Sequence, residues 1–254
     1  MKKGQISYFL LVALILLISS SFIFYFNSTS SEKPKSQNSF GMNLDPIKNY
    51  LNNCVKITSE DAVTTLGWQG GLIIYDENRM ITTHFGAITY AYKDRRNTFP
   101  SKQEMEKQLE LYTDIILARC IENLSSYQGW ELEKEKIDTH VSINENSVLF
   151  NINYPIKLKK EKTVEEFSEF RTEVPVRLGY IHSAINSIIE KQVKEPGWIP
   201  FTNLNEFDVN VTFYPYKKNN FIYEFVDDKS LIKNEPYRFL VANMFEEVNL
   251  DEIT

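Results

Sequence analysis

The sequence is poor in the residues and motifs that build catalytic and metal sites. Its 254 residues include two cysteines and three histidines, and no two histidines have the spacing of the metalloprotease motif HExxH. Two cysteines without histidines at suitable spacing are too few for a structural zinc site. The nucleophile elbow GxSxG, the phosphate-binding loop and the dinucleotide fingerprint are also absent. We therefore predict no catalytic, cofactor-binding or metal-binding residues.

The histidines and the adjacent acidic pairs are weak candidates for chemistry. His84, His140 and His182 lie far apart in the sequence, and we interpret each as a surface or structural residue. Asp227 and Asp228 form one of several neighbouring acidic pairs. A general acid and a general base need separation and a cleft. We therefore interpret these pairs as solvated charge.

Positive charge is also in short supply. The chain has 28 Lys and Arg against 34 Asp and Glu, for a formal net charge of −6. Lys2 and Lys3 place part of the positive charge at the extreme N-terminus. Nucleic-acid binding normally needs a clustered basic face, and so does flat attachment to anionic lipid. The composition thus argues against a nucleic-acid partner.

One long uncharged segment is present near the N-terminus. Residues 5–31 carry no Asp, Glu, Lys or Arg, and residues 6–26 read ISYFLLVALILLISSSFIFYF. A helix of this length covers about 30 Å, the thickness of the hydrocarbon core of a bilayer. We predict a transmembrane helix over residues 5–26 that anchors the chain in the lipid bilayer.

The short basic tail before this helix predicts its orientation. Lys2 and Lys3 favour a cytoplasmic N-terminus, which makes the chain a single-pass cell-membrane protein with an extracellular C-terminal domain. A cleaved secretory signal peptide is the alternative, with the three serines at 19–21 as the nearest cleavage site. Apolar aromatic residues continue beyond these serines, so a retained anchor is the preferred interpretation.

The residues before the apolar run add a family resemblance. The order Lys-Lys-Gly-Gln-Ile-Ser over residues 2–7 resembles the class III signal peptide of archaeal type IV pilin-like proteins. In that family a prepilin peptidase cuts after the glycine. The resemblance implies cleavage between Gly4 and Gln5 and removal of residues 1–4 as a basic leader. Those pilins commonly carry Glu at the fifth mature position, where this sequence has Phe9, and that departure counts against assembly into a pilus.

A second resemblance extends over the whole chain. Its segments, in order, are KGQIS, the apolar span, DPIKNYLNNC, LGWQGG, a capped helix ending in Cys, NYPIKL, EVPVRL and NEPYRFLVA. This order resembles a group of uncharacterised membrane-anchored proteins from small-genome archaea. The resemblance implies a location and a fold, and no activity.

The remainder of the chain divides into a stalk and a domain. Residues 27–41 are rich in Ser, Asn and Lys without periodicity, which predicts a flexible stalk. Helical spacing and cap residues predict three main helices in residues 42–254, which begin at Asp45, after Ser101 and at Pro175. On the second helix, one face is predicted to carry Met105, Leu109, Tyr112, Ile116 and Cys120.

Alternating patterns predict the strands of this domain. The predicted strands are 72–75, one within 80–92, 137–143, 148–159, 163–174, 207–213, 221–226 and 237–243. For residues 165–170, a helix is the alternative. We expect the first two to pair as a hairpin. Helices and hairpins are mixed without a βαβ rhythm, so the sequence predicts an extracellular α+β domain with a mostly antiparallel sheet.

The two cysteines and three sequons are consistent with an extracellular domain. Cys54 and Cys120 lie on the apolar faces of different predicted helices, and a disulfide between them is expected outside the cell. Two buried free thiols are the alternative. Asn27, Asn123 and Asn210 fit the glycosylation acceptor pattern.

These observations lead to three functional hypotheses. The first is a membrane-anchored cell-surface protein of non-enzymatic type, which binds a surface protein, self-associates or contributes to the envelope. The second is a pilin-like subunit that assembles through its apolar helix. The third is an envelope enzyme whose site is assembled from dispersed residues.

Overall fold

A computed structural model describes residues 44–122, 130–196, 198, 206–217 and 219–245. The predicted leader, transmembrane helix and stalk lie outside these ranges. Within the described ranges, no helix is both long enough and apolar enough to cross a membrane.

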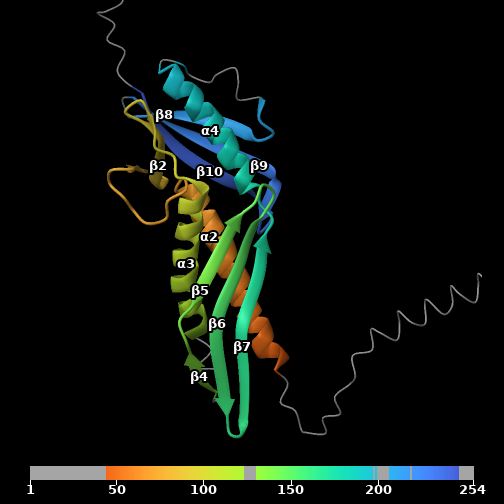
Figure 1. The fold of residues 1–254 in the computed structure, drawn as a ribbon. Coiled ribbons are helices and arrows are strands. Elements are labelled where there is room, and N and C mark those ends of the chain that lie inside the picture. The colour runs from red at the N-terminus through yellow and green to blue at the C-terminus, as the bar shows by residue number, and fades with distance from the viewer. Residues whose placement is uncertain (1–43, 123–129, 197, 199–205, 218, 246–254) are drawn as a thin grey trace, which may run out of the picture. The chain divides into compact units, whose positions relative to one another are not determined.

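Within the described ranges, the chain forms three helices and ten strands. Figure 1 shows how they are arranged. The helices are α2 (Asp45–Trp68), α3 (Lys102–Glu122) and α4 (Leu178–Lys194). The strands are β1 (Met80–Thr83), β2 (Gly86–Lys93), β3 (Arg96–Asn97), β4 (Glu131–Lys134), β5 (Asp138–Ile143), β6 (Val148–Lys160), β7 (Thr163–Val174), β8 (Asn210–Tyr216), β9 (Asn220–Ile232) and β10 (Glu235–Met244). The prediction of an α+β domain with three helices and mostly antiparallel sheets is confirmed.

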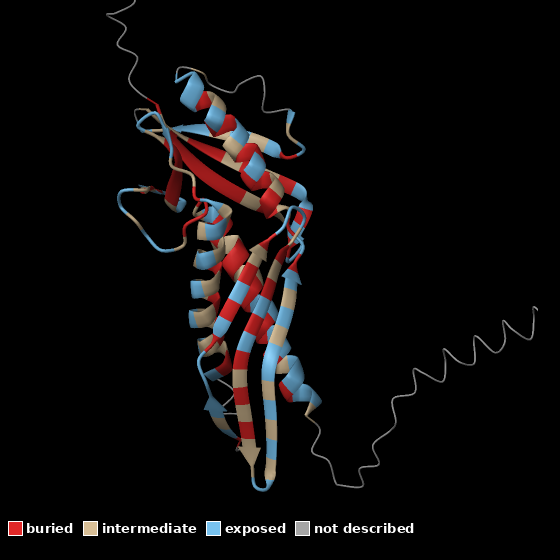
Figure 2. Cartoon of the chain, in the orientation of Figure 1, coloured by how far each residue is buried: buried red, intermediate tan, exposed pale blue. Residues whose placement is uncertain are grey.

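The first sheet is antiparallel and has β6 at its centre. Strands β4 and β5 pair with successive parts of β6 on one side, and β7 pairs with β6 on the other. Alternate residues of β6 from Val148 to Leu158 are buried (Figure 2). On the neighbouring strands, α3 contacts β5 and α2 contacts β7. On the opposite face of β6, Asn151 and Asn153 are exposed, and the other residues are half-buried.

The second sheet has the order β1-β2-β10-β9-β8, with β3 beside β2. Only the pairing of β10 with β2 is parallel among the described strand pairs. Helix α4 lies on one face, where Asn243 of β10 donates to Gln192 at 2.8 Å. On the other face, the hydroxyl of Tyr216 on β8 donates to the carbonyl oxygen of Thr82 on β1 at 3.0 Å. The two outer strands therefore approach each other and enclose an apolar cluster made of Ile88, Tyr90, Ile222, Leu240 and Ala242.

The C-terminal end of α2 connects to this second sheet through a close backbone approach. A Cβ atom on Gly70 would lie 2.4 Å from the carbonyl oxygen of Leu240, and the φ of Gly70 is +71°. Beside it, the backbone N–H of Thr89 donates to the carbonyl oxygen of Gln69 at 3.0 Å. Only glycine fits at position 70, because a side chain would collide with β10 and strain the backbone.

A disulfide connects α2 to α3 at their other end. Cys54 and Cys120 form the disulfide that the sequence predicted, with 2.02 Å between their sulfurs. The hydroxyl of Tyr50 donates to the carbonyl oxygen of Cys120 at 2.7 Å. The bond closes a loop of 66 residues and stabilises the fold by about 4 kcal/mol on the chain-entropy model.

The predicted hairpin of 72–75 with 80–92 is wrong. Residues 72–75 form a loop, and β1 pairs with β2 instead. The backbone N–H groups of Ile73 and Ile74 donate to the side chain of Gln108 on α3, so they are not available to a strand partner. This loop forms the groove described below.

Candidate functional site

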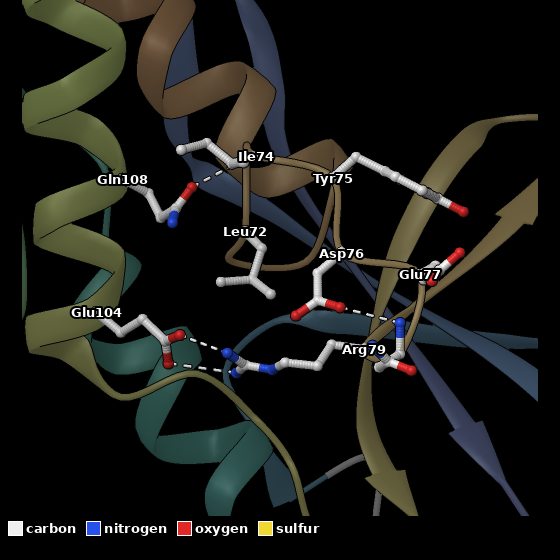
Figure 3. A pocket seen from close by; sticks show the side chains of 9 residues that line it. Leu72, Ile74, Tyr75, Asp76, Glu77, Arg79, Glu104 and Gln108 are labelled. Carbon is white, nitrogen blue, oxygen red and sulfur yellow. Dashed lines mark hydrogen bonds and ion pairs between the residues drawn. The ribbon is translucent and has the colours of Figure 1, made fainter.

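A groove lies where the loop after α2 passes the N-terminal half of α3. Its volume is about 580 Å³. We call it the α3 groove; it is lined by Leu72, Ile74, Tyr75, Asp76, Glu77, Asn78, Arg79, Glu104 and Gln108 (Figure 3). Residues 72–79 supply one wall and α3 supplies the other.

Gln108 fixes the position of the loop. Its side-chain oxygen accepts hydrogen bonds from the backbone N–H group of Ile73 at 3.0 Å and from that of Ile74 at 2.9 Å. Figure 3 shows the bond to Ile74. Further along, the carboxylate of Asp76 accepts from the N–H of Asn78 at 2.9 Å. Gln108 therefore ties the first part of the loop to α3, and the turn at residues 76–78 is closed by its own hydrogen bond.

An ion pair closes one end of the groove. The guanidinium of Arg79 donates twice to the carboxylate of Glu104, with 3.2 Å between Nη2 and Oε2 (Figure 3). This two-point contact raises the pKa of Arg79 above its ordinary value. The N–H of Glu104 also donates to Ser101 Oγ at 3.2 Å, which confirms the predicted cap of α3.

Exposed apolar side chains flank the groove. Ile74 and Tyr75 are 57% and 58% exposed, while Leu72 beneath them is buried. The apolar surface continues along α3, because Leu111 and Ile115 lie three and seven residues beyond Gln108, and they are 48% and 54% exposed. We call Ile74, Tyr75, Leu111 and Ile115 the apolar rim. A cluster of large exposed apolar side chains beside polar groups is typical of an interaction site.

The polar side chains of the groove carry carboxylate, amide, guanidinium and phenol groups. No serine, cysteine or histidine is among the lining residues. Asp76 and Glu104 already accept hydrogen bonds from Asn78 and Arg79. The described parts of the chain contain no group of three His, Cys, Asp or Glu side chains that is placed to hold a metal ion.

The other predicted site residues do not lie at this groove. Cys54 and Cys120 form the disulfide at the far end of α3. Asn210 is exposed at the start of β8, where its Nδ2 donates to Asp228 at 2.7 Å. The predicted processing residues Gly4 and Gln5, and the sequon residues Asn27 and Asn123, lie outside the described ranges.

The histidines are not brought together. His84 lies beside Phe85 in the turn between β1 and β2, with 3.8 Å between ring centroids and the ring planes tilted by 42°. His182 on α4 is buried, its Nε2 lies 3.0 Å from the carbonyl oxygen of Pro100, and burial lowers its pKa. His140 on β5 is 3.4 Å from the carboxylate of Glu110, and its side chain is 77% exposed. The Glu110 oxygen beside it also accepts a backbone hydrogen bond from β5.

The interpretation of Asp227 as solvated charge is wrong. Asp227 is fully buried on β9 and binds the guanidinium of Arg177 through both carboxylate oxygens, at 2.9 and 2.5 Å. Arg177 also donates to Asp208 at 2.9 Å. Burial alone would raise the pKa of Asp227, but the hydrogen bonds from Arg177, Ser230 and the N–H of Lys229 outweigh it and lower the pKa.

The chain was compared with protein-family models, with curated proteins and with solved structures, and none matches it.

Proposed function

We propose that this chain is a membrane-anchored cell-surface protein of non-enzymatic type, which binds a partner protein at the α3 groove. The observation that carries the binding role is the exposure of Ile74 and Tyr75 on a loop fixed by Gln108. A loop that is already held in place loses little conformational freedom on binding. Tyr75 and Arg79 both line the groove, and tyrosine and arginine are residue types enriched at binding hot spots.

Sequence features support the location. The uncharged segment over residues 5–26 has the length of a membrane span, and Lys2 and Lys3 precede it. The disulfide between Cys54 and Cys120 is typical of proteins that fold in an oxidising compartment.

The location can be tested with the full chain in intact cells. A membrane-impermeant amine reagent should label lysines of residues 45–254, and the protein should stay with membranes washed in alkaline carbonate. Mass analysis of the same material would report whether the chain begins at Gln5. Release by carbonate, or labelling only after the cells are lysed, would rule out the proposed anchor or orientation.

The binding role can be tested by site-specific photo-crosslinking on the cell surface. A photoreactive phenylalanine analogue at Tyr75 should yield one discrete crosslinked product. The same analogue at Tyr214, which is 42% exposed on β8, is the matched control and should yield none. A product at Tyr75 that contains two copies of this chain would favour the pilin-like alternative. Equal, diffuse crosslinking at both positions would count against a specific site.

A further inference from the structure

The two edges of the first sheet differ in their hydrogen bonds to neighbouring helices. At the β5 edge, Glu110 of α3 accepts a hydrogen bond from the N–H of Val141 at 3.1 Å. Glu106, one helical turn earlier, accepts from the N–H of Ile143 at 2.8 Å. Helix carboxylates therefore bind the N–H groups that β5 directs away from the sheet. The opposite edge is formed by β7 (Figure 1).

The hydrogen-bond alternation identifies which groups of β7 face outward. Val141 directs its N–H away from β6, so the opposed pair of Val141 and Phe150 is not hydrogen-bonded. Phe150 must then bond toward β7, where it is opposite Thr172. It follows that the N–H and C=O groups of Arg171 and Glu173 point away from β6. The same alternation applies to Glu169.

This edge has no strand partner within the described ranges. β7 is 12 residues long and pairs with β6 alone. Glu169, Arg171 and Glu173 are all exposed. Helix α2 contacts β7, and its Lys48 and Asn52 line a hollow together with Glu169. An edge strand of this length can accept an added strand from another chain.

The side chains of β7 indicate the chemistry of such a strand. Glu166, Glu169 and Glu173 lie on the exposed face of the sheet, with Arg171 as the only basic residue of β7. Across the sheet, Lys157 of β6 lies 3.9 Å from Glu166, so β6 already complements β7 with positive charge. A second copy of β7 would bring glutamates toward glutamates, which is unfavourable.

We propose that the outer edge of β7 binds an extended basic segment of another protein by strand addition. The segment carries Lys or Arg opposite Glu169 and Glu173, and an acidic or neutral residue opposite Arg171. Backbone hydrogen bonds to residues 169–173 supply affinity, and the alternating charges supply register and selectivity. This site is separate from the α3 groove and does not depend on the function proposed for it.

Three synthetic heptapeptides test the proposal on the full chain in detergent. TKVEVKT places lysines opposite Glu169 and Glu173. TEVKVET reverses the charges, and a third peptide is TKVEVKT with an N-methyl group on its central glutamate, which removes one backbone donor. By fluorescence anisotropy, TKVEVKT should bind at least tenfold more tightly than either control. It should also slow amide exchange of Arg171 and Glu173. Equal binding of the N-methylated peptide, or no slowing in β7, would overturn the proposal.

Two variants make the result independent of any loss of folding. The double substitution Glu169→Lys with Glu173→Lys should reverse the preference, so that TEVKVET becomes the tighter ligand. Arg171→Pro should abolish binding, because it removes both an outward N–H group and the guanidinium opposite the central glutamate of the peptide. The unfolding temperature should change little, because no hydrogen bond to β6 is lost at this position. Unchanged preference in the double variant would show that the peptides bind elsewhere.

Discussion

The carboxylate of Glu106 on α3 accepts a hydrogen bond from the backbone N–H of Ile143 on β5 at 2.8 Å. Glu110 makes the same contact with Val141 at 3.1 Å. Four helical residues advance about 6 Å and two strand residues advance about 6.6 Å. The spacing of the two glutamates thus matches the spacing of the two N–H groups, and α3 closes this edge of the sheet.

Removing one of these carboxylates should destabilise the domain. We expect Glu106→Ala to lower the free energy of unfolding by about 1–3 kcal/mol, because the N–H of Ile143 then lacks its acceptor. Glu106→Gln keeps an acceptor oxygen and should lose less. Urea unfolding followed by circular dichroism measures both. If the two variants lose equal stability, the hydrogen bond to Ile143 is not the reason why Glu106 stabilises the domain.

Asp114 follows Glu110 by one turn and provides a test by pH. Burial raises the pKa of its carboxyl, and the negative charges of Asp138 and Glu110 act in the same direction. The folded state therefore holds the proton more tightly than the unfolded chain. The associated stability is fully present below the unfolded-state pKa of about 4 and is lost as the pH rises through the folded-state pKa.

We accordingly expect Asp114→Asn to be more stable than the wild type at about pH 7, with a gain that shrinks toward about pH 4. The measurement is the free energy of unfolding in urea across this range. Glu131→Gln, at an exposed position of β4, is the control for a general loss of negative charge. A gain that is constant with pH would argue against a raised pKa at Asp114.

The buried pair of Arg177 and Asp227 should be important for stability. Asp227→Asn leaves the guanidinium of Arg177 without its buried partner and should cost about 3–5 kcal/mol. Because the folded-state pKa of Asp227 is lowered, the stability it contributes is present above the unfolded-state pKa of about 4 and is lost as the pH falls through the folded-state pKa. Acid titration of the unfolding free energy should show less loss in Asp227→Asn than in the wild type.

The exposed pair of Lys157 and Glu166 is the control for this effect. Its atoms are 3.9 Å apart and both side chains are at least 40% exposed. We expect Glu166→Gln to change stability by less than about 1 kcal/mol at neutral pH. A comparable loss from both substitutions would mean that burial of Asp227 is not the reason for its effect.

Alanine substitutions at two glycines can distinguish the cost of a steric collision from the cost of backbone strain. Gly86→Ala places a Cβ in open space at a φ of +112°, so its cost is about 1–2 kcal/mol of backbone strain. Gly70→Ala adds a collision with the carbonyl oxygen of Leu240 to a φ of +71°. We expect the loss of stability at Gly70 to exceed that at Gly86 by more than twofold in thermal unfolding. Similar losses would mean that the contact of α2 with β10 relaxes easily.

Local periodicity predicted most elements of the fold. The strict alternation along residues 148–158 identified β6, because one face of this strand is buried and the other is not. The second helix was predicted in the right place, but its buried face was not. Met105 and Leu109 are buried as expected, whereas Thr113, Leu117 and Ile121 replace Tyr112, Ile116 and Cys120. The buried residues follow steps of four, since one side of α3 lies against β5.

The candidate site was not predicted, because its contacts are distant in sequence. The sequence pattern around Ile73 and Ile74 predicts a strand. In the structure, their N–H groups donate to Gln108, which lies about 35 positions later in the chain. Similarly, Asp227 resembles surface charge in the sequence, since its partner Arg177 is 50 residues away. Single-sequence patterns report the near neighbours of a residue, and they carry no signal for such pairs.

The second sheet begins with β1 at Met80 and includes β10, which ends at Met244. β2 lies between β1 and β10, so one side of it stays open until residues 235–244 have been synthesised. The first sheet is built from the continuous stretch 131–174 and has no such requirement. The second sheet should therefore be the last part of the domain to form. A chain truncated before β10 would leave the apolar strand β2 without its partner, and such a chain should aggregate.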